Sequence, residues 1–273
     1  QSFNHSIIQS TNQPIIQSSN HPIIQSMALV NEYIESGNYF FRKRSFIPLV
    51  LYLLATGVIV IDAGDILYEP DLLWSMMCLA ISLLGLAVRI MVVGTVPGGT
   101  SGRNTKKQLA RSLNTRGIYS IVRHPLYLGN FLMWLGLIIY VGNIWFWIVA
   151  VLLYWVYYER IMFAEEDFLK QKFGEDFERW AAQTPAFIPG LKKWKSPHMA
   201  FSVRKVIRRE YRGLFAVILS FVYLNLLKNY VLHDRLMLTQ HWLILLILGT
   251  LLFITIRLLR KYTRVLNNRR STN

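Results

Sequence analysis

The stretch SIVRHPLYLGN, residues 120–130, places an arginine, a histidine and a proline directly before an apolar run. A helix that only crosses a membrane needs none of these residues at its start. Pro125 suits the first turn of a helix, because a proline there loses no hydrogen bond, and His124 would then be the cap residue. Tyr127 and Gly129 follow within about a turn. A side-chain donor, free backbone amides and the positive end of the helix dipole would meet at one point, which favours an anionic group.

The same residues also allow a simpler interpretation. Arg123 and His124 would only anchor the helix among the lipid headgroups, and Tyr127 would belong to the aromatic belt of a membrane protein. The residue types alone do not separate the two interpretations.

The composition indicates an integral membrane protein. The chain has 273 residues, 53% of them hydrophobic, and a mean hydropathy of +0.32, yet its formal net charge is +15. A basic soluble protein would suggest a nucleic-acid partner. Several apolar runs here approach the roughly 20 residues that a helix needs to cross a bilayer, so the basic segments are better explained as cytoplasmic loops, with no nucleic-acid partner.

The apolar runs predict an all-α, polytopic fold with about six transmembrane helices. The region from Leu126 to Met162 is about twice one span and is broken near Gly142 and Asn143, which predicts a helical hairpin with its turn there. Arg89 lies inside one run, near its end, where its side chain can extend to the headgroups. Besides the hairpin region there are four apolar runs, and Arg89 lies in the second of them: Phe46–Ile61, Leu72–Gly94, Gly213–Leu227 and Trp242–Ile256.

Charge placement supports this count. Lysine and arginine gather on the cytoplasmic side of short loops, and here basic and non-basic connections alternate. We therefore expect both termini in the cytoplasm. The basic segments are Arg42–Arg44, Val96–Arg123, Arg160–Arg212 and the tail from Arg257.

Two features limit what the chain can be. Cys78 is the one cysteine, so we predict no disulfide framework and no cysteine metal site. Residues 3–26 repeat an eight-residue unit rich in Asn, Gln and Ser, which cannot bury a core. We expect residues 1–26 to be disordered and non-native, with Met27 as the true start.

A second region that could carry chemistry runs from Tyr157 to Leu191. If it is helical, Glu166 pairs with Lys170 at i, i+4 and faces water. Glu165 shares its face with Tyr158, Ile161, Met162 and Leu169, so its carboxylate needs a partner, either a base or a ligand donor. The residues after Phe173 and Gly174 predict a turn and a short amphipathic helix beneath the membrane.

Together these elements resemble the isoprenylcysteine carboxyl methyltransferase family and its bacterial phospholipid methyltransferase-like relatives. The matching elements are NTRGIYSIVRHPLYLGN, a helical hairpin, EEDFLKQKFGEDFERW and TPAFIPG, which together cover about Ser101–Gly190. On this resemblance we divide the chain into a first pair of membrane helices (27–95), a methyltransferase core with the cofactor motifs (96–195), and two further membrane helices with a basic tail (196–273).

The resemblance implies S-adenosylmethionine as the cofactor, in a pocket on the cytoplasmic side. Glu165 matches the family's cofactor-contacting carboxylate. The family's arginine on the substrate side lies four residues before that glutamate, where this chain has Ile161; Arg160 lies five before it. We nevertheless take Arg160 and Glu165 as the candidate catalytic pair, with no metal. The implied cofactor contacts are Asn114, Thr115, Arg116, Gly117, Tyr119, His124, Pro125, Leu126, Tyr127 and Glu165.

The expected function is methyl transfer to a lipid or lipid-linked acceptor, through either a carboxylate or an amine, in a bacterial inner membrane. One alternative is an NADPH-dependent membrane sterol or enone reductase, because that superfamily resembles the same arrangement around an Arg-His motif. The other is a non-enzymatic subunit or transporter, which would place polar residues deep within several spans. No sequence pattern indicates which group accepts the methyl or how many subunits the protein has.

Overall fold

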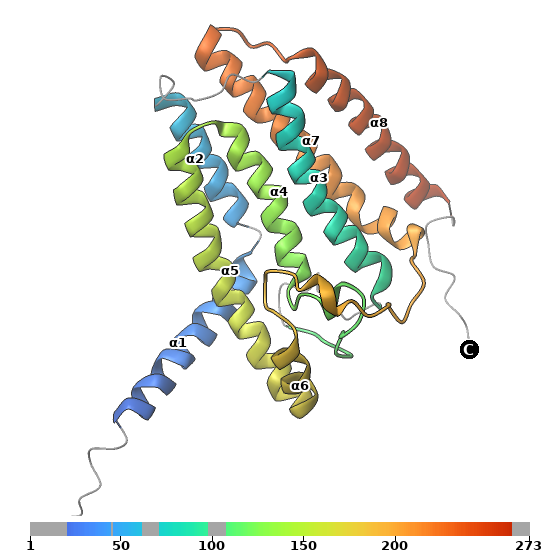
Figure 1. Cartoon of the computed structure of the whole chain (residues 1–273). Coiled ribbons are helices and arrows are strands. Elements are labelled where there is room, and N and C mark those ends of the chain that lie inside the picture. The colour runs from blue at the N-terminus through green and yellow to red at the C-terminus, as the bar shows by residue number, and fades with distance from the viewer. Residues whose placement is uncertain (1–20, 45, 62–70, 98–107, 264–273) are drawn as a thin grey trace, which may run out of the picture.

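The computed structural model describes residues 21–44, 46–61, 71–97 and 108–263, and it confirms an all-α fold (Figure 1). Within these residues there is no strand, and a single isolated antiparallel bridge joins Gly117 to Lys195. The helices are α1 (His21–Lys43), α2 (Ile47–Ile61), α3 (Leu72–Thr95), α4 (Pro125–Val141), α5 (Ile144–Phe173), α6 (Glu175–Gln183), α7 (Val203–His233) and α8 (Gln240–Tyr262), with short 3-10 turns at Ile118–Ser120 and Leu191–Lys193.

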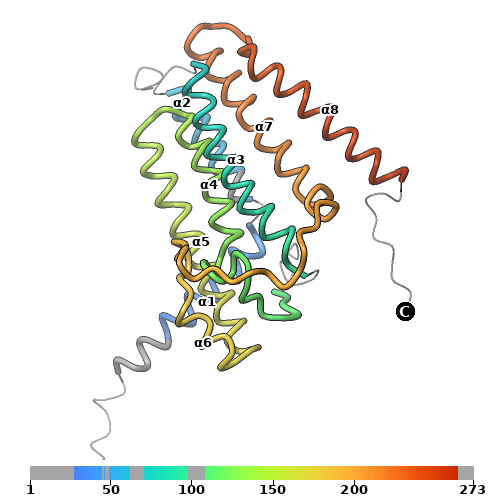
Figure 2. The backbone as a smooth tube through the Cα atoms, turned by 45° about the vertical axis from the view of Figure 1, so that its right-hand side comes forward, coloured from blue at the N-terminus to red at the C-terminus, as the bar shows by residue number. Residues whose placement is uncertain are grey.

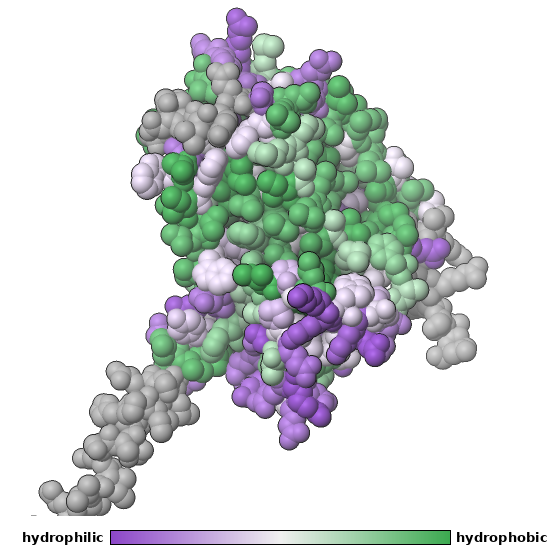
Figure 3. Space-filling view, in the orientation of Figure 1, coloured by the Kyte–Doolittle hydropathy of each residue, from purple (hydrophilic) through white to green (hydrophobic). Residues whose placement is uncertain are grey.

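Each predicted apolar run forms a helix. Among the described residues, α3, α5, α7 and α8 are long and apolar enough to cross a membrane, and α2 and α4 are shorter apolar helices. The chain is thus a multi-pass membrane protein, as predicted. In Figure 3 the apolar side chains form a broad band, and hydrophilic side chains gather below it, around α6 and the neighbouring connections.

The hairpin prediction is also confirmed at its turn. α4 ends at Val141, and Gly142 follows with φ = 84°, a left-handed conformation that glycine adopts without strain. Asn143 then caps α5, because its side-chain oxygen accepts the Phe146 N–H at 2.9 Å. One glycine and one asparagine therefore reverse the chain between two apolar helices.

The sequence did not predict α1, which packs along α5. The Arg160 guanidinium lies 3.4 Å from the centre of the Tyr33 ring, and the Gly37 backbone lies against the Arg160 carbonyl. α1 begins at His21, inside the repeat that the sequence led us to expect to be disordered. Residues 1–20 of the repeat lie outside the described residues.

Glycines allow α3 and α4 to pack closely. A Cβ added to Gly85 would collide with backbone atoms of Gly129 and Met133, and one added to Gly136 would collide with Ser82 and the Cys78 carbonyl. Ser82 also donates its hydroxyl to the Met133 carbonyl at 2.8 Å. Small residues commonly allow such close contact between membrane helices, where packing rather than water exclusion holds helices together.

Polar contacts join the C-terminal helices α7 and α8 to this core at both ends of α7. One set lies at the lower end of α7 in Figure 1. Arg89 of α3 donates from Nε and Nη2 to the carboxylate of Glu210 in α7, at 3.0 and 3.2 Å, and from Nη1 to Asn130 of α4 at 2.6 Å. The position of Arg89 would allow its side chain to extend to the headgroups, but its charge is paired inside the protein instead.

The other end of α7 is joined by Asn225, which is fully buried. Its side-chain oxygen accepts from the N–H and hydroxyl of Thr239, at 3.0 and 2.9 Å, and its amide donates to the Tyr140 hydroxyl at 3.1 Å. α7 packs on α3 along its length, with α8 on its outer side (Figure 2).

We predict that Gly85→Ala and Gly136→Ala lower the thermal midpoint of the detergent-purified protein by several degrees, since an added methyl group must separate α3 from α4. Gly57→Ala is the matched control, because a Cβ there meets nothing within 4 Å. Equal melting of all three variants would contradict the proposed role of the close contact.

Candidate functional site

The site begins where α4 starts, at His124 and Pro125. Pro125 is the first helical residue and His124 the cap, as predicted, and the His124 side chain is 4% exposed. The backbone here is held by a distant segment: the N–H groups of Arg123 and His124 donate to the carbonyls of Pro185 and Ala186, at 2.9 and 3.1 Å. The TPAFIPG motif therefore fixes the entry to α4.

Glu166 pairs with this entry and does not face bulk water, so the interpretation of it as a water-facing residue is wrong. Its Oε1 lies 2.7 Å from His124 Nε2 and 2.9 Å from Arg123 Nε. The expected partner, Lys170, pairs with Glu178 at 2.9 Å instead. Because an ionised carboxylate only accepts, Nε2 of His124 is the donor, and in a neutral ring Nδ1 then becomes an acceptor.

Arg123 connects this pair to a third helix. Its Nη1 donates to the Ala181 carbonyl at the end of α6, at 2.9 Å. Its Nε–H does not point along the contact with Glu166, so that contact is an ion pair rather than a hydrogen bond. Arg123 thus joins the start of α4 to α5 and α6.

Glu165 faces the apolar cluster, as the sequence predicted. Its Oε2 accepts the Tyr127 hydroxyl at 2.8 Å and lies 3.9 Å from His124 Nδ1, while its side chain remains 34% exposed. Tyr158, Ile161 and Met162 are buried on the same face of α5, beside Tyr127. Within the described chain Oε1 of Glu165 has no partner, so this oxygen is available to a ligand.

Tyr119 lies near the same carboxylate. Burial, and then the charge of Glu165, raise the pKa of the Tyr119 phenol, so it stays a neutral donor at any physiological pH. The Trp180 indole N–H of α6 donates to the Tyr119 carbonyl at 3.0 Å. The structure therefore brings His124, Tyr127 and Glu165 together, with Tyr119 close enough for the charge of Glu165 to act on its phenol. These four are among the ten cofactor contacts that the family resemblance implied.

The remaining proposed cofactor contacts are less closely gathered. Gly117 has φ = 62°, and its N–H donates to the Lys195 carbonyl at 2.8 Å. Asn114 and Thr115 are half-buried and Arg116 is exposed, and none has a side-chain hydrogen bond in the described chain. Leu126 packs beside an apolar cluster that contains Val92 and Val122.

Arg160, the proposed catalytic arginine, lies on the side of α5 that faces α1. Its guanidinium stacks on Tyr33, and in the described residues it forms no ion pair. The structure does not bring it to the cluster around Glu165.

Sequence reasoning did not identify the residues that pack around the site residues and hold the neighbouring segments in place. Phe187 packs on Phe131 of α4 and Trp155 of α5, with ring centres 5.7 and 5.4 Å apart. Ser120 donates its hydroxyl to the Gly117 carbonyl and accepts the Lys195 N–H at 2.9 Å. The backbone bonds of residues 185–195 carry no side-chain signature, so only the matched position of TPAFIPG pointed to them.

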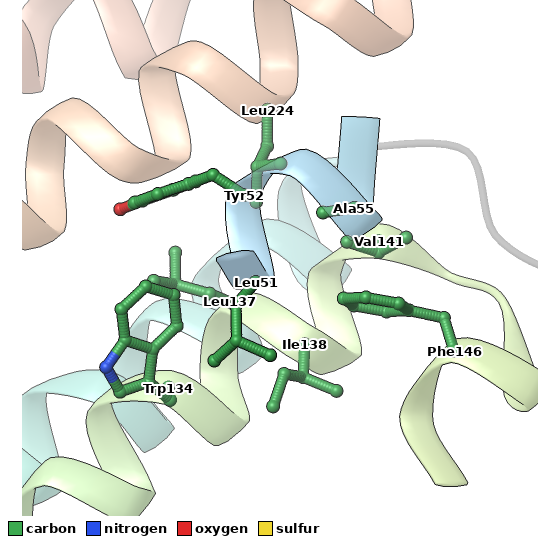
Figure 4. A pocket seen from close by; sticks show the side chains of 9 residues that line it. All are labelled: Leu51, Tyr52, Ala55, Trp134, Leu137, Ile138, Val141, Phe146 and Leu224. Carbon is green, nitrogen blue, oxygen red and sulfur yellow. The ribbon is translucent and has the colours of Figure 1, made fainter. Parts of the chain in front are cut away.

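A small apolar cavity of about 10 Å³ lies farther along α4, among α2, α4, α5 and α7 (Figure 4). Trp134 lines it and also packs against the cluster around Tyr127. The other lining residues are Leu51, Tyr52, Ala55, Leu137, Ile138, Val141, Phe146 and Leu224.

The comparison with family models agrees with the sequence motifs. Residues 74–176 match the model of the phospholipid methyltransferase family. This range runs from α3 to the start of α6 and contains the whole Tyr119–Glu165 cluster. No solved structure matches the chain.

Curated relatives each match part of the chain. A protein-S-isoprenylcysteine O-methyltransferase of Schizosaccharomyces pombe is 33% identical over 31% of this chain and 36% of its own length. Protein-S-isoprenylcysteine O-methyltransferase B of Arabidopsis thaliana is 28% identical over 50% of this chain and 73% of its own length. The nickel-cobalt-cadmium resistance protein NccN of Alcaligenes xylosoxydans xylosoxydans is 36% identical over 31% and 39% of the two chains.

The chain spans little more than a third of the length of the Schizosaccharomyces pombe and Alcaligenes relatives that it matches. Residues 74–176 are thus similar to the phospholipid methyltransferase family, and parts of the chain are similar to two isoprenylcysteine O-methyltransferases.

Proposed function

We propose that the protein is an S-adenosylmethionine-dependent membrane methyltransferase that acts on a lipid or lipid-linked acceptor. The observation that carries this proposal is the Tyr119–Glu165 cluster, defined as Tyr119, His124, Tyr127 and Glu165, at the polar end of an apolar helix hairpin. The family match and the names of the two isoprenylcysteine relatives support the same chemistry.

The residues of the cluster fit such a cofactor. Among the described residues Oε1 of Glu165 has no partner, and this acceptor suits an ammonium group or ribose hydroxyls. The start of α4 presents the positive end of the helix dipole, suited to a carboxylate. The cofactor supplies a methyl group on a cationic sulfonium. Glu165, Tyr119 and His124 would bind and orient it, and Phe187 with its aromatic neighbours would exclude water from it.

Positioning is the main contribution expected of the protein. Methyl transfer is an in-line displacement, so alignment of the acceptor and the methyl group can supply roughly 7 to 11 kcal/mol at best. Glu166 and Arg123 act through His124: they fix the orientation and tautomer of its ring without facing the cluster themselves. We retain Arg160 as a proposed catalytic residue, with the requirement that it turn away from Tyr33.

The apolar lining of the small cavity, rather than its volume, supports an acceptor with a hydrocarbon chain. Trp134 follows Tyr127 by two turns of α4, about 10 Å along its axis. A chain whose reactive headgroup lies beside Tyr127 would therefore reach the cavity within the length of a fatty acyl or prenyl group. The acceptor atom, a carboxylate oxygen or an amine nitrogen, is not selected by the cluster.

We predict that Glu165→Gln and His124→Ala each weaken binding of S-adenosylhomocysteine about ten- to hundredfold, since a charged hydrogen bond contributes about 1.5 to 3 kcal/mol. Glu166→Gln should weaken it as well, through loss of the His124 orientation. Calorimetry on the detergent-purified protein measures this.

Asp167→Asn is the matched control for these variants, because Asp167 is the next carboxylate on α5 and bonds only Gln171 at 2.7 Å. If Asp167→Asn weakened binding as much as Glu165→Gln, the cluster would not be the cofactor site. Binding of NADPH in place of S-adenosylhomocysteine would favour the reductase instead.

We expect the purified protein to transfer a labelled methyl group from S-adenosylmethionine to a membrane lipid fraction, giving a product heavier by one methylene in mass spectrometry. Glu165→Gln should abolish most of the transfer and Asp167→Asn should preserve it. If the protein bound the cofactor but labelled no lipid or lipidated species, the proposed acceptor class would be excluded.

The side of the membrane is a further prediction. We propose that the Tyr119–Glu165 cluster and both termini face the cytoplasm, because the basic connections lie at that end. Reporters fused after Asn143 and His233 should then report the non-cytoplasmic side, and a fusion after Lys193 the cytoplasm. A cytoplasmic signal from Asn143 would contradict this orientation.

A further inference from the structure

Two arginines from different helices converge on one tyrosine at the lower end of α7 and α8 in Figure 1. Tyr211 of α7 is buried, 6% exposed. Its hydroxyl accepts from Arg212 Nε and from Arg260 Nη1, each at 3.0 Å. Their guanidinium carbons lie 5.7 and 5.6 Å from the centre of the Tyr211 ring. Two positive charges are thus held beside a single neutral oxygen.

Neither charge is balanced by a carboxylate in the described part of the chain. The nearest acidic residue in the sequence, Glu210, is engaged by Arg89 from the other side of α7. The Nε of Arg260 is buried and has no hydrogen-bond partner among the described residues. Residues 264–273 add three arginines and no side-chain carboxylate. A buried, charged donor without a partner is costly, which indicates that a ligand completes it.

The surroundings strengthen the attraction for an anion. Basic residues continue on both helices around the Arg212–Arg260 pair. Clusters of basic residues between membrane helices near the headgroup region are typical binding sites for acidic lipid headgroups. Arginine also suits phosphate, because its planar N–H groups can donate two parallel hydrogen bonds. The neighbouring basic residues are Arg204, Lys205, Arg208, Arg209, Arg257 and Lys261.

The apolar side of the same place favours a lipid over a free phosphate. Tyr211 packs on Ile256 and Phe253, which continue into the membrane span of α8. On the outer surface of α8, Leu252, Leu258 and Leu259 are exposed, at 46, 49 and 38%. A headgroup at the arginines would therefore have its acyl chains beside an apolar helix face.

We propose that Tyr211, Arg212 and Arg260 form a binding site for the phosphate of an anionic phospholipid, seated between α7 and α8. Tyr211 is the positioning residue, which aims both guanidinium groups at the same headgroup. The site is separate from the Tyr119–Glu165 cluster and does not depend on the proposed methyl transfer.

The experiment is native mass spectrometry of the purified full-length protein, with phosphatidylglycerol as the probe and phosphatidylcholine as the neutral lipid. The wild-type protein should retain phosphatidylglycerol preferentially. Arg212→Gln with Arg260→Gln should reduce its affinity at least about tenfold, since charged hydrogen bonds to the phosphate are lost. Tyr211→Phe should give a smaller loss of affinity, because both arginines remain but the hydroxyl that orients their guanidinium groups is gone.

The matched control is Arg257→Gln with Lys261→Gln, which removes the same total of two charges, both from α8, without touching Tyr211. If this control lost as much affinity as the Arg212 and Arg260 variant, the attraction would be a general property of the basic surface and the site would be refuted. Inorganic phosphate that displaced the lipid at equal concentration would refute the lipid assignment.

Folding can be separated from binding in the same series. Arg212 is exposed, so Arg212→Gln alone should fold as wild type does, with an unchanged thermal midpoint in neutral detergent. It should still weaken retention of phosphatidylglycerol several-fold. Unchanged retention in this variant would overturn the proposal even if the double variant could not be purified.

Discussion

The guanidinium of Arg89 is the contact on which the arrangement of four helices depends. A charge near the bilayer is costly unless it is paired, and a buried pair that loses one partner is strongly destabilised. Arg89 of α3 reaches Glu210 of α7 and Asn130 of α4, and the Asn130 amide lies 3.5 Å from the Tyr158 hydroxyl of α5. Gly129 makes this possible, because a Cβ there would collide with the Arg89 side chain.

From Tyr158 the same contacts lead into the candidate site. The rings of Tyr158 and Tyr127 lie 5.1 Å apart, and the Tyr127 hydroxyl donates to Glu165. α7 lies outside the region that matches the methyltransferase family, yet its Glu210 neutralises the arginine that supports the site. The C-terminal helices are thus part of the folded unit rather than an appendage to it.

The sequence predicted those features that depend on neighbouring residues. Apolar runs predicted the helices, and Gly142, Asn143, Pro125 and Gly174 predicted their ends, because backbone conformation and hydrogen bonding at a helix end are local. The gathering of His124 and Glu165 came instead from the family resemblance and from the apolar face of α5.

The sequence failed where the partner comes from far along the chain. Glu166 was assigned to Lys170, four residues away, although His124 and Arg123 bind it. Arg89 was assigned to the headgroups because Glu210 is 121 residues distant. α1 lacks a continuous apolar run, and its packing against α5 depends on a cation and an aromatic ring that no periodicity indicates.

The connection between residues 185–195 and the start of α4 has a consequence for the order of assembly. The backbone N–H groups of Arg123 and His124 donate to carbonyls that are made after α6, and the Trp180 contact to Tyr119 joins residues 61 positions apart. A nascent chain that ends before Pro185 already contains α4 and α5 but leaves those groups unpaired. Because closing such a loop costs entropy before any contact forms, the site is completed late in synthesis, after the hairpin has entered the membrane.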